Sequence, residues 1–318
     1  MKRDNRFKDE RGFALLLSLL VVLLLTVLIL EIDDQARADL RAAGNFRDDL
    51  NAFYLARSGI SAGEAILKED LRLSNKYDGL DEPWASLLGL EYPLGDGVLS
   101  GSIVDEGGKF NLNTLVNNDG GTTGTAVTRQ RQLRRLFQLL QVNPDLVDPI
   151  VDWIDRDQTP MPFGAEDEIY RSLDPPYSAK NLPFDTLEEL RLVRGMTDEV
   201  YKKMTPYLTV YMNGAGIINV NTAHWVLFQS LDEGIDESIA RRLAGNASNV
   251  YDTKGKFIDR LPADVKSRMT TNSTQTWLGI GSNVFSITAT GRVQNTVKTI
   301  RAVVRRGSPA ELLYFRVD

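Results

Sequence analysis

The sequence predicts an α+β fold in which one long N-terminal helix packs on a small antiparallel sheet, and a large all-α domain is inserted between the strands of that sheet. Three patterns predict this fold. Helical spacing runs from the N-terminus to about residue 70. Strand-like segments occur after residue 96 and return only near Val284. Helical patterns fill the roughly 165 residues between these strand regions.

Composition limits the chemistry that the chain can perform. Its 318 residues are 42% hydrophobic and 25% charged, as in a globular protein large enough for about two domains. The net charge of -6 and the pI near 5.1 give no general basic field for nucleic acid or anionic lipid. The chain has no cysteine and one histidine, His224, to which we assign no chemistry. Thiolate catalysis and the usual zinc sites are therefore excluded, and we expect a metal to be bound by oxygen.

Residues 1–12 and 13–30 form a basic leader followed by an apolar segment. The apolar segment carries no charge over eighteen residues, and as a helix it would span roughly 27 Å, close to the thickness of a hydrocarbon core. The leader has five basic and three acidic residues, and acidic residues follow the apolar segment. The positive-inside rule therefore predicts a single-pass helix with the leader in the cytoplasm. No small-residue cleavage site follows, so we expect the helix to be retained.

Residues 31–70 continue the same helix beyond the membrane, because apolar residues from Ile32 to Leu67 keep mostly three- and four-residue steps. Glycines in this helix predict bends or close packing on the sheet. Residues 59–63 also spell the G-x-S-x-G pattern of hydrolases. That pattern needs a strand-turn-helix context and a histidine partner, so inside a predicted helix we interpret it as coincidence.

Alternating apolar residues and turn signals place the strands. The predicted strands cover residues 97–104, 110–115, 285–289, 297–304 and 312–317, with a turn at residues 105–109. We therefore divide the remaining chain into a sheet-bearing domain (first part, residues 71–116), an inserted helical domain (117–283) and C-terminal strands that return to the sheet (284–318).

An acidic loop within the helical domain is the strongest candidate site. Four acidic residues lie within thirteen positions beside prolines and a glycine, and the candidate ligands are Asp155, Asp157, Gln158, Glu166 and Asp167. Clustered carboxylate, amide and carbonyl oxygens suit calcium, although the spacing is not that of an EF-hand. We assign Asp152 to the preceding helix and Trp153 to core packing. An acidic surface loop without metal is the alternative.

A helix-hairpin-helix pattern follows this loop. Residues 185–188 form a predicted capping box, and Gly195 marks the turn of the hairpin. Such hairpins often grip nucleic-acid backbones, here with Arg194, Lys202 and Lys203 as the phosphate ligands. Asp198 and Glu199 occupy the place where anions would bind, so the pattern favours structural packing.

A weak internal repeat also favours a structural role for this region. Residues 109–114 resemble residues 216–222, and each segment carries two alternating asparagines, Asn111 and Asn113 in the first and Asn219 and Asn221 in the second. Ligand or glycan binding is one interpretation. We predict instead that these side chains cap helices and satisfy loop backbone.

The junction Arg11-Gly12-Phe13-Ala14-Leu15-Leu16-Leu17 resembles a type IV prepilin junction, in which a basic leader ends in glycine before a hydrophobic helix. This resemblance implies cleavage after Gly12 by prepilin peptidase and methylation of the Phe13 amine. Loss of the leader's net +2 would take the chain from -6 to -8. A plain signal anchor with a chance Arg-Gly-Phe is the alternative for this segment. Most pilins carry glutamate five residues into the mature chain, where this sequence has Leu17.

The acidic run from Asp152 to Asn181, with the order D-W-I-D-x-D-Q, G-A-E-D, Y, P-Y and N, resembles the hallmark of the K-type minor pseudopilins of type II secretion. This family shares the absence of the glutamate, has a pilin-like body split by a helical domain, and binds calcium in that domain. With the junction and the split sheet, the resemblance covers nearly the whole chain.

The resemblance implies a non-enzymatic protein-transport role at the tip of the pseudopilus. The mature chain would sit in the inner membrane with its body in the periplasm, and its bulky helical domain would stop addition of further subunits. Implied partners are the I- and J-type minor pseudopilins, prepilin peptidase, the pseudopilus shaft, and the secretin or exported proteins. The resemblance also implies that the chain helps to initiate assembly of the pseudopilus and to control its length.

Two other classes stay open at this point. One is a membrane-anchored helix-hairpin-helix protein that binds nucleic acid in a DNA-uptake or related type IV pilus system. The other is a membrane-tethered enzyme, which would need two carboxylates of the acidic loop poised as acid and base in a cleft.

Overall fold

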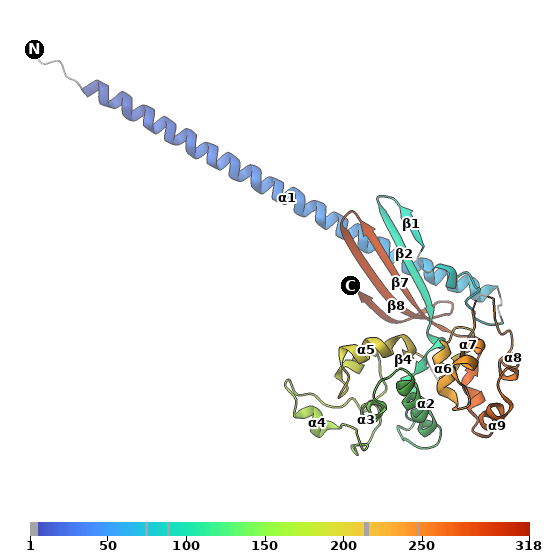
Figure 1. The fold of residues 1–318 in the computed structure, drawn as a ribbon. Coiled ribbons are helices and arrows are strands. Elements are labelled where there is room, and N and C mark those ends of the chain that lie inside the picture. The colour runs from blue at the N-terminus through green and yellow to red at the C-terminus, as the bar shows by residue number, and fades with distance from the viewer. Residues whose placement is uncertain (1–5, 74–75, 88–89, 213–215, 247) are drawn as a thin grey trace, which may run out of the picture.

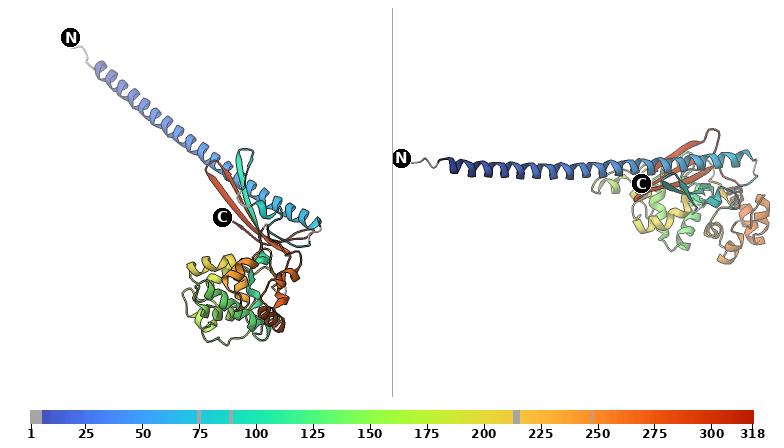
Figure 2. Two further views of the ribbon diagram at one scale, coloured as in Figure 1. Left: turned by 45° about the vertical axis from the view of Figure 1, so that its right-hand side comes forward. Right: turned by 90° about the horizontal axis from the view of Figure 1, so that it is seen from above.

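The computed structural model describes residues 6–73, 76–87, 90–212, 216–246 and 248–318. Residues 1–5 of the predicted leader lie outside this part. The longest element is helix α1, Arg6–Arg72. Its first half projects away from the body and its second half lies along the sheet (Figure 1; Figure 2). The prediction of one helix to about residue 70 is confirmed.

The projecting half of α1 contains the predicted membrane segment. Its apolar side chains are exposed throughout residues 13–30. Among the described residues, α1 is the helix that is long and apolar enough to cross a membrane. Because no protein surface covers these side chains, their burial has to come from another apolar phase.

The sheet has five strands in the order β1-β2-β7-β8-β9, and all neighbours are antiparallel. Its strands are β1 (Glu91–Leu94), β2 (Gly97–Asp105), β7 (Val284–Val293), β8 (Thr296–Arg305) and β9 (Glu311–Val317). The sequence predicted β2 and the three C-terminal strands but not β1. Since β2 pairs directly with β7, the two halves of the sheet come together across the whole inserted segment, as the predicted α+β architecture requires.

Helix α1 packs on one face of this sheet through small and branched side chains. Ala56 and Ile60 share a buried cluster with Ile287, Ala289 and strand β8. Two glycines set the close approach: a Cβ on Gly59 would lie 2.7 Å from the Cβ of Ala289, and one on Gly63 would lie 2.9 Å from Ile287. Of the two roles predicted for these glycines, close packing is the one observed.

The helical domain has a separate hydrophobic core. Its helices are α2 (Thr125–Leu139), α3 (Val147–Asp152), α4 (Asp167–Arg171), α5 (Asp198–Met204), α6 (Trp225–Leu231), α7 (Glu237–Leu243), α8 (Lys254–Asp259) and α9 (Ala263–Thr271). Phe110, Leu112 and Leu115 are fully buried in this core. The helical domain therefore begins before residue 117, the predicted boundary.

Two short parallel strand pairs, which the sequence did not predict, lie inside the helical domain. Strand β3 (Phe110–Asn111) pairs with β4 (Leu208–Thr209), and β5 (Ile218–Asn219) pairs with β6 (Leu278–Gly279). The predicted strand 110–115 was therefore too long and was assigned to the wrong sheet: after Asn111 the chain turns into a 3-10 helix. The predicted turn at 105–109 also contains a 3-10 helix, Glu106–Gly108.

The asparagine repeat marks two equivalent corners of this domain. The Asn113 carboxamide donates to the carbonyls of Phe184 and Val210 and accepts from Phe184 N. Asn221 does the same with Tyr251 and Ile280. Asn111 and Asn219 each accept from the backbone N–H two residues later. The predicted capping role is confirmed for all four side chains.

Candidate functional site

An acidic centre lies between helices α3 and α4. Asp152, Asp155 and Glu166 each place one carboxylate oxygen within 4.8 Å of the others. Their exposures are 0%, 2% and 5%, so the centre is shielded from water. Three buried carboxylates repel one another, and the arrangement requires protons or a cation to be stable.

The chain between α3 and α4 folds around Asp152. This residue ends α3, and its carboxylate accepts hydrogen bonds from Met161 N at 3.1 Å and from Ala165 N at 2.8 Å. Gly164 is required at the crossing point, because a Cβ there would lie 1.7 Å from Asp152 Oδ2. The loop thus fixes one carboxylate by backbone donors and brings Glu166 beside it.

Burial and mutual repulsion raise the pKa of all three acids. Desolvation is the main cause, and it raises the pKa of Glu166 to about 8, that of Asp152 to about 7 and that of Asp155 to about 6. The neighbouring carboxylates add to the shift of each. The centre therefore favours binding of positive charge near neutral pH.

The oxygen atoms of this centre fit a calcium ion. Asp155 Oδ1 and both carboxylate oxygens of Glu166 are buried and have no hydrogen-bond partner among the described residues. Asn181 Oδ1 is also buried without a hydrogen-bond partner among the described residues. The backbone N–H of Asn181 donates to Trp153 O at 2.9 Å, which ties Asn181 to the end of α3 beside Asp152. Orphaned buried oxygens are rare in folded proteins, and carboxylate and amide oxygens are the ligands that calcium prefers.

The structure brings together two of the five predicted ligands, Asp155 and Glu166. Asp157 and Gln158 are exposed, and the Asp157 carboxylate accepts from Thr159 N. Asp167 lies in the first turn of α4, where it pairs with Arg171 and accepts from Ala179 N. Asp157 and Asp167 are therefore held by other partners away from the centre, and Gln158 lies on the surface.

Asp152 is the functional residue that sequence reasoning missed. It does belong to the preceding helix, as predicted, but its carboxylate turns into the centre. The signal was its three-residue spacing from Asp155 across a helix end, which puts both side chains on one side. Trp153 is 3% exposed and packs edge-on against Tyr170 at 5.2 Å, which confirms its predicted role in the core.

The helix-hairpin-helix segment packs against the acidic loop. Gly195 has φ +80° at the turn, and Arg194 Nη1 donates to Gly164 O at 3.1 Å. The capping box is present one residue later than predicted, with Thr186 and Glu189 as its members in place of Asp185 and Glu188. Arg194, a predicted phosphate ligand, is thus used inside the domain.

The other motifs and residues singled out from the sequence lie where no catalytic arrangement of the described residues surrounds them. Residues 59–63 lie inside α1, so the strand-turn-helix context of a hydrolase elbow is missing there. His224 Nδ1 accepts from Val226 N and caps α6. Gly12, Phe13 and Leu17 all lie on the exposed projecting part of α1.

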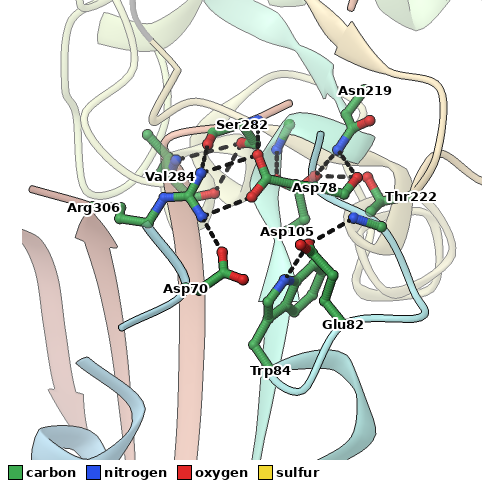
Figure 3. Close-up of polar contacts among 12 residues, drawn as sticks. Asp70, Asp78, Glu82, Trp84, Asp105, Asn219, Thr222, Ser282, Val284 and Arg306 are labelled. Carbon is green, nitrogen blue, oxygen red and sulfur yellow. Dashed lines mark hydrogen bonds and ion pairs between the residues drawn. The ribbon is translucent and has the colours of Figure 1, made fainter. Parts of the chain in front are cut away.

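A second buried polar cluster joins the helical domain to the sheet, and Figure 3 shows its members converging from segments far apart in the chain. At its centre, Arg306 forms ion pairs with Asp70 at 2.6 Å and Asp78 at 2.7 Å, and donates to Ser282 O. Nearby, Asp105 at the end of β2 accepts from the helical domain through Asn219 Nδ2 and Thr222 Oγ1. We call this cluster the junction.

The junction holds more acids than bases. Glu82 accepts from Trp84 Nε1 at 2.9 Å and lies close enough to Asp70 and Asp78 to group with them. Burial raises the pKa of Glu82 to about 7 and also raises the pKa of Asp105. Arg306 is already paired to two of the carboxylates within the sheet-bearing part. The link to the helical domain is made by the bonds of Asp105 with Asn219 and Thr222 and by the bond from Arg306 to Ser282 O.

Comparison with known proteins places this fold and site in one family. Residues 108–213, which include the whole acidic loop, match the family model described as "Type II secretion system (T2SS), protein K". The chain is 27% identical to the type II secretion system protein K of Aeromonas hydrophila over 97% of both chains. It is 31% identical to that of Klebsiella pneumoniae over 67% of this chain and 66% of the relative.

A solved structure shares the fold. It is the GspK-GspI-GspJ complex from enterotoxigenic Escherichia coli, matched with a TM-score of 0.71 and 24% identity over 88% of this chain and 99% of that chain. The split sheet, the inserted helical domain and the near full-length match to the relatives agree with one another. The chain belongs to the type II secretion system protein K family.

Proposed function

We propose that this protein is the minor pseudopilin that caps the pseudopilus tip of a type II secretion system. The observation that carries the proposal is the combination of a bare apolar helix with a bulky domain at its far end (Figure 1). A subunit of this shape can be drawn into a helical filament by α1. Its helical domain then occupies the space above the last turn, so no further subunit adds there.

Anchoring and processing form the first part of the proposal. Prepilin peptidase removes residues 1–12, methylates Phe13, and leaves α1 in the inner membrane with the body in the periplasm. The exposed apolar side chains of α1 and the charge asymmetry around them support this topology. Gly12 is exposed, as a cleavage site has to be.

The tip position forms the second part. Leu17 stands where pilins carry a glutamate, and a subunit with none above it has no use for that carboxylate. The solved complex that shares this fold contains GspI and GspJ beside GspK, which supports an assembly of this chain with the I- and J-type minor pseudopilins. Initiation of assembly, length control and contact with the shaft, the secretin or exported proteins follow from that position.

Calcium binding forms the third part. Asp152, Asp155 and Glu166 would hold the ion, with Asn181 as a further oxygen donor. The ion would neutralise the buried carboxylates and so fix the loop between α3 and α4. Arg194, which donates to Gly164 O, would then hold the hairpin against an ordered loop.

The decisive experiment is the intact mass of the protein from membranes of cells with and without prepilin peptidase. We expect loss of residues 1–12 and gain of one methyl group only when the peptidase is present. A Gly12→Val variant is the control and should keep its leader in both strains. A full-length chain in both strains would refute the processing step and favour the alternative of a protein with a plain signal anchor.

The tip position needs a separate test. We expect the processed protein to co-purify with the I- and J-type minor pseudopilins in a discrete complex and to be absent from the middle of sheared filaments. Regular incorporation along the shaft, measured by immunogold labelling of filaments, would contradict the capping role.

A further inference from the structure

A cleft beside helix α2 lies outside the acidic centre and the junction. It encloses about 750 Å³ and is walled by α2, by the loop after α6 and by α9. Four arginines line it, Arg131, Arg134 and Arg135 from α2 and Arg268 from α9. Such a concentration of guanidinium groups is unusual in a chain whose net charge is -6.

Two of these arginines are neutralised within the fold. Arg268 pairs with Asp232 at 2.6 Å and with Asp264 at 3.0 Å, so the two acids on that wall are already satisfied. Arg134 pairs with Asp148 at 2.5 Å, outside the cleft. These pairs hold the walls in place but leave little of their charge available.

The other two arginines form no ion pair within the described part of the chain, although Arg135 lies near enough to Asp232 to contribute to the lowered pKa of that carboxyl. Arg131 is exposed and has no ion pair or hydrogen bond within the part of the chain that the structure describes. Arg135 is half-buried and uses only Nε, which donates to Gln229 O at 2.7 Å. The two residues are four apart on α2, so their guanidinium groups line the same wall. Glu233 is the exposed acid that remains on the opposite side.

We propose that this arginine-lined cleft binds an acidic segment of a partner protein through Arg131 and Arg135. A guanidinium fork with free N–H groups is complementary to a carboxylate, which it binds in a bidentate manner. Uncharged side chains on the walls can pair with the backbone of an extended segment, and these are Thr128, Gln138 and Asn272.

The remaining acid of the cleft selects against a nucleic acid. A continuous phosphate backbone would meet Glu233, which has no ion pair within the described part of the chain, on the wall opposite α2. A peptide can place single carboxylates on the two arginines and turn its N–H donors toward Glu233. This inference does not depend on the tip position or on calcium.

The test uses the full-length protein in detergent and a fluorescein-labelled peptide of six glutamates, with the six-glutamine peptide as the reference ligand. Fluorescence anisotropy should show that the protein binds the glutamate peptide and does not bind the glutamine peptide. The double variant R131Q/R135Q should bind it about tenfold more weakly, which corresponds to about 1.4 kcal/mol. The matched control is K202Q/K203Q, which removes the same charge from the hairpin helix α5 and should change the affinity less than twofold.

Three outcomes would overturn the proposal. The first is that the glutamate peptide fails to bind the parent protein, and the second is that R131Q/R135Q binds it with the affinity of the parent. The third is that K202Q/K203Q lowers the affinity as much as R131Q/R135Q does, which would indicate a general charge effect. Tighter binding of a labelled single-stranded oligonucleotide that is lost in R131Q/R135Q would assign the cleft to nucleic acid instead. Circular dichroism melting of each variant checks that the fold is kept, since neither arginine lies in the core.

Discussion

Replacing Arg306 with methionine tests how strongly the buried ion pairs of the junction stabilise the fold. The Arg306 side chain is 10% exposed, and those of Asp70 and Asp78 are each 5% exposed. Methionine keeps the length of the side chain and its packing on Phe285, but it removes the charge that balances both carboxylates. Removing one partner of a buried ion pair costs about 3–5 kcal/mol, because the remaining charge is left buried and unpaired. We expect a loss of that size in the free energy of unfolding.

The measurement is urea denaturation of the full-length protein in detergent, followed by tryptophan fluorescence. Arg292→Met is the matched control, because Arg292 pairs with Glu91 at 3.4 Å on the surface and both side chains are at least half exposed. Such a pair contributes less than about 1 kcal/mol.

A compensating variant separates charge from packing. If the unpaired carboxylates cause the loss, adding Asp70→Asn and Asp78→Asn to R306M should restore part of the stability, since neutral amides carry no buried charge. The reasoning would be refuted if R306M were no less stable than R292M. It would also be refuted if the triple variant were as unstable as R306M.

Three further predictions concern single buried groups. Burial raises the pKa of Glu82 to about 7 in the folded protein, above its ordinary 4.5, so its contribution to stability is lost as the pH rises from about 4.5 through 7. The denaturation midpoint of Glu82→Gln, measured relative to that of the parent protein, should therefore be higher at pH 8 than at pH 5. The same difference between variant and parent at pH 5 and at pH 8 would contradict this prediction. Gly164→Ala places a Cβ 1.7 Å from Asp152 Oδ2, so it should abolish the stabilisation that we expect calcium to give in thermal melting, whereas Gly255→Ala, whose Cβ would lie at an ordinary van der Waals distance of 4.0 Å from Thr253 Oγ1, should keep it. Asn221→Ala leaves buried backbone groups unpaired and should cost about 3 kcal/mol, whereas Asn118→Ala, at an exposed position, should cost little; similar denaturation midpoints for the two variants would refute the corner role.

The sequence could predict the parts of this fold that repeat along the chain. The three- and four-residue spacing of α1 and the alternation in β2, β7 and β8 are local periods, and each period dictates its own element. The paired asparagines were recognisable for the same reason, because the pattern occurs twice. Strand β1 has no such period, since all four of its residues are exposed and one is Pro93.

The short parallel pairs were beyond sequence reasoning. Each strand of β3, β4, β5 and β6 has two residues, too few to show alternation, and each pair joins segments at least 60 residues apart in the chain. The predicted strand 110–115 failed because the Asn111 side chain accepts from Asn113 N and starts a 3-10 helix. Local side-chain bonds of this kind override strand propensity.

By itself, the sequence determined the long apolar N-terminal helix, the split of the sheet, the resemblance to its family and the neighbourhood of the acidic centre. Only the tertiary structure decided which oxygens meet there, because hydrogen bonds to Thr159 and Ala179 draw Asp157 and Asp167 away while the crossing at Gly164 turns Asp152 inward. The junction was decided in the same way, since Arg306 lies 236 residues from Asp70. Charges so far apart carry no local pattern, and their pairing exists only once α1 and the segment after it have packed beside the end of β8.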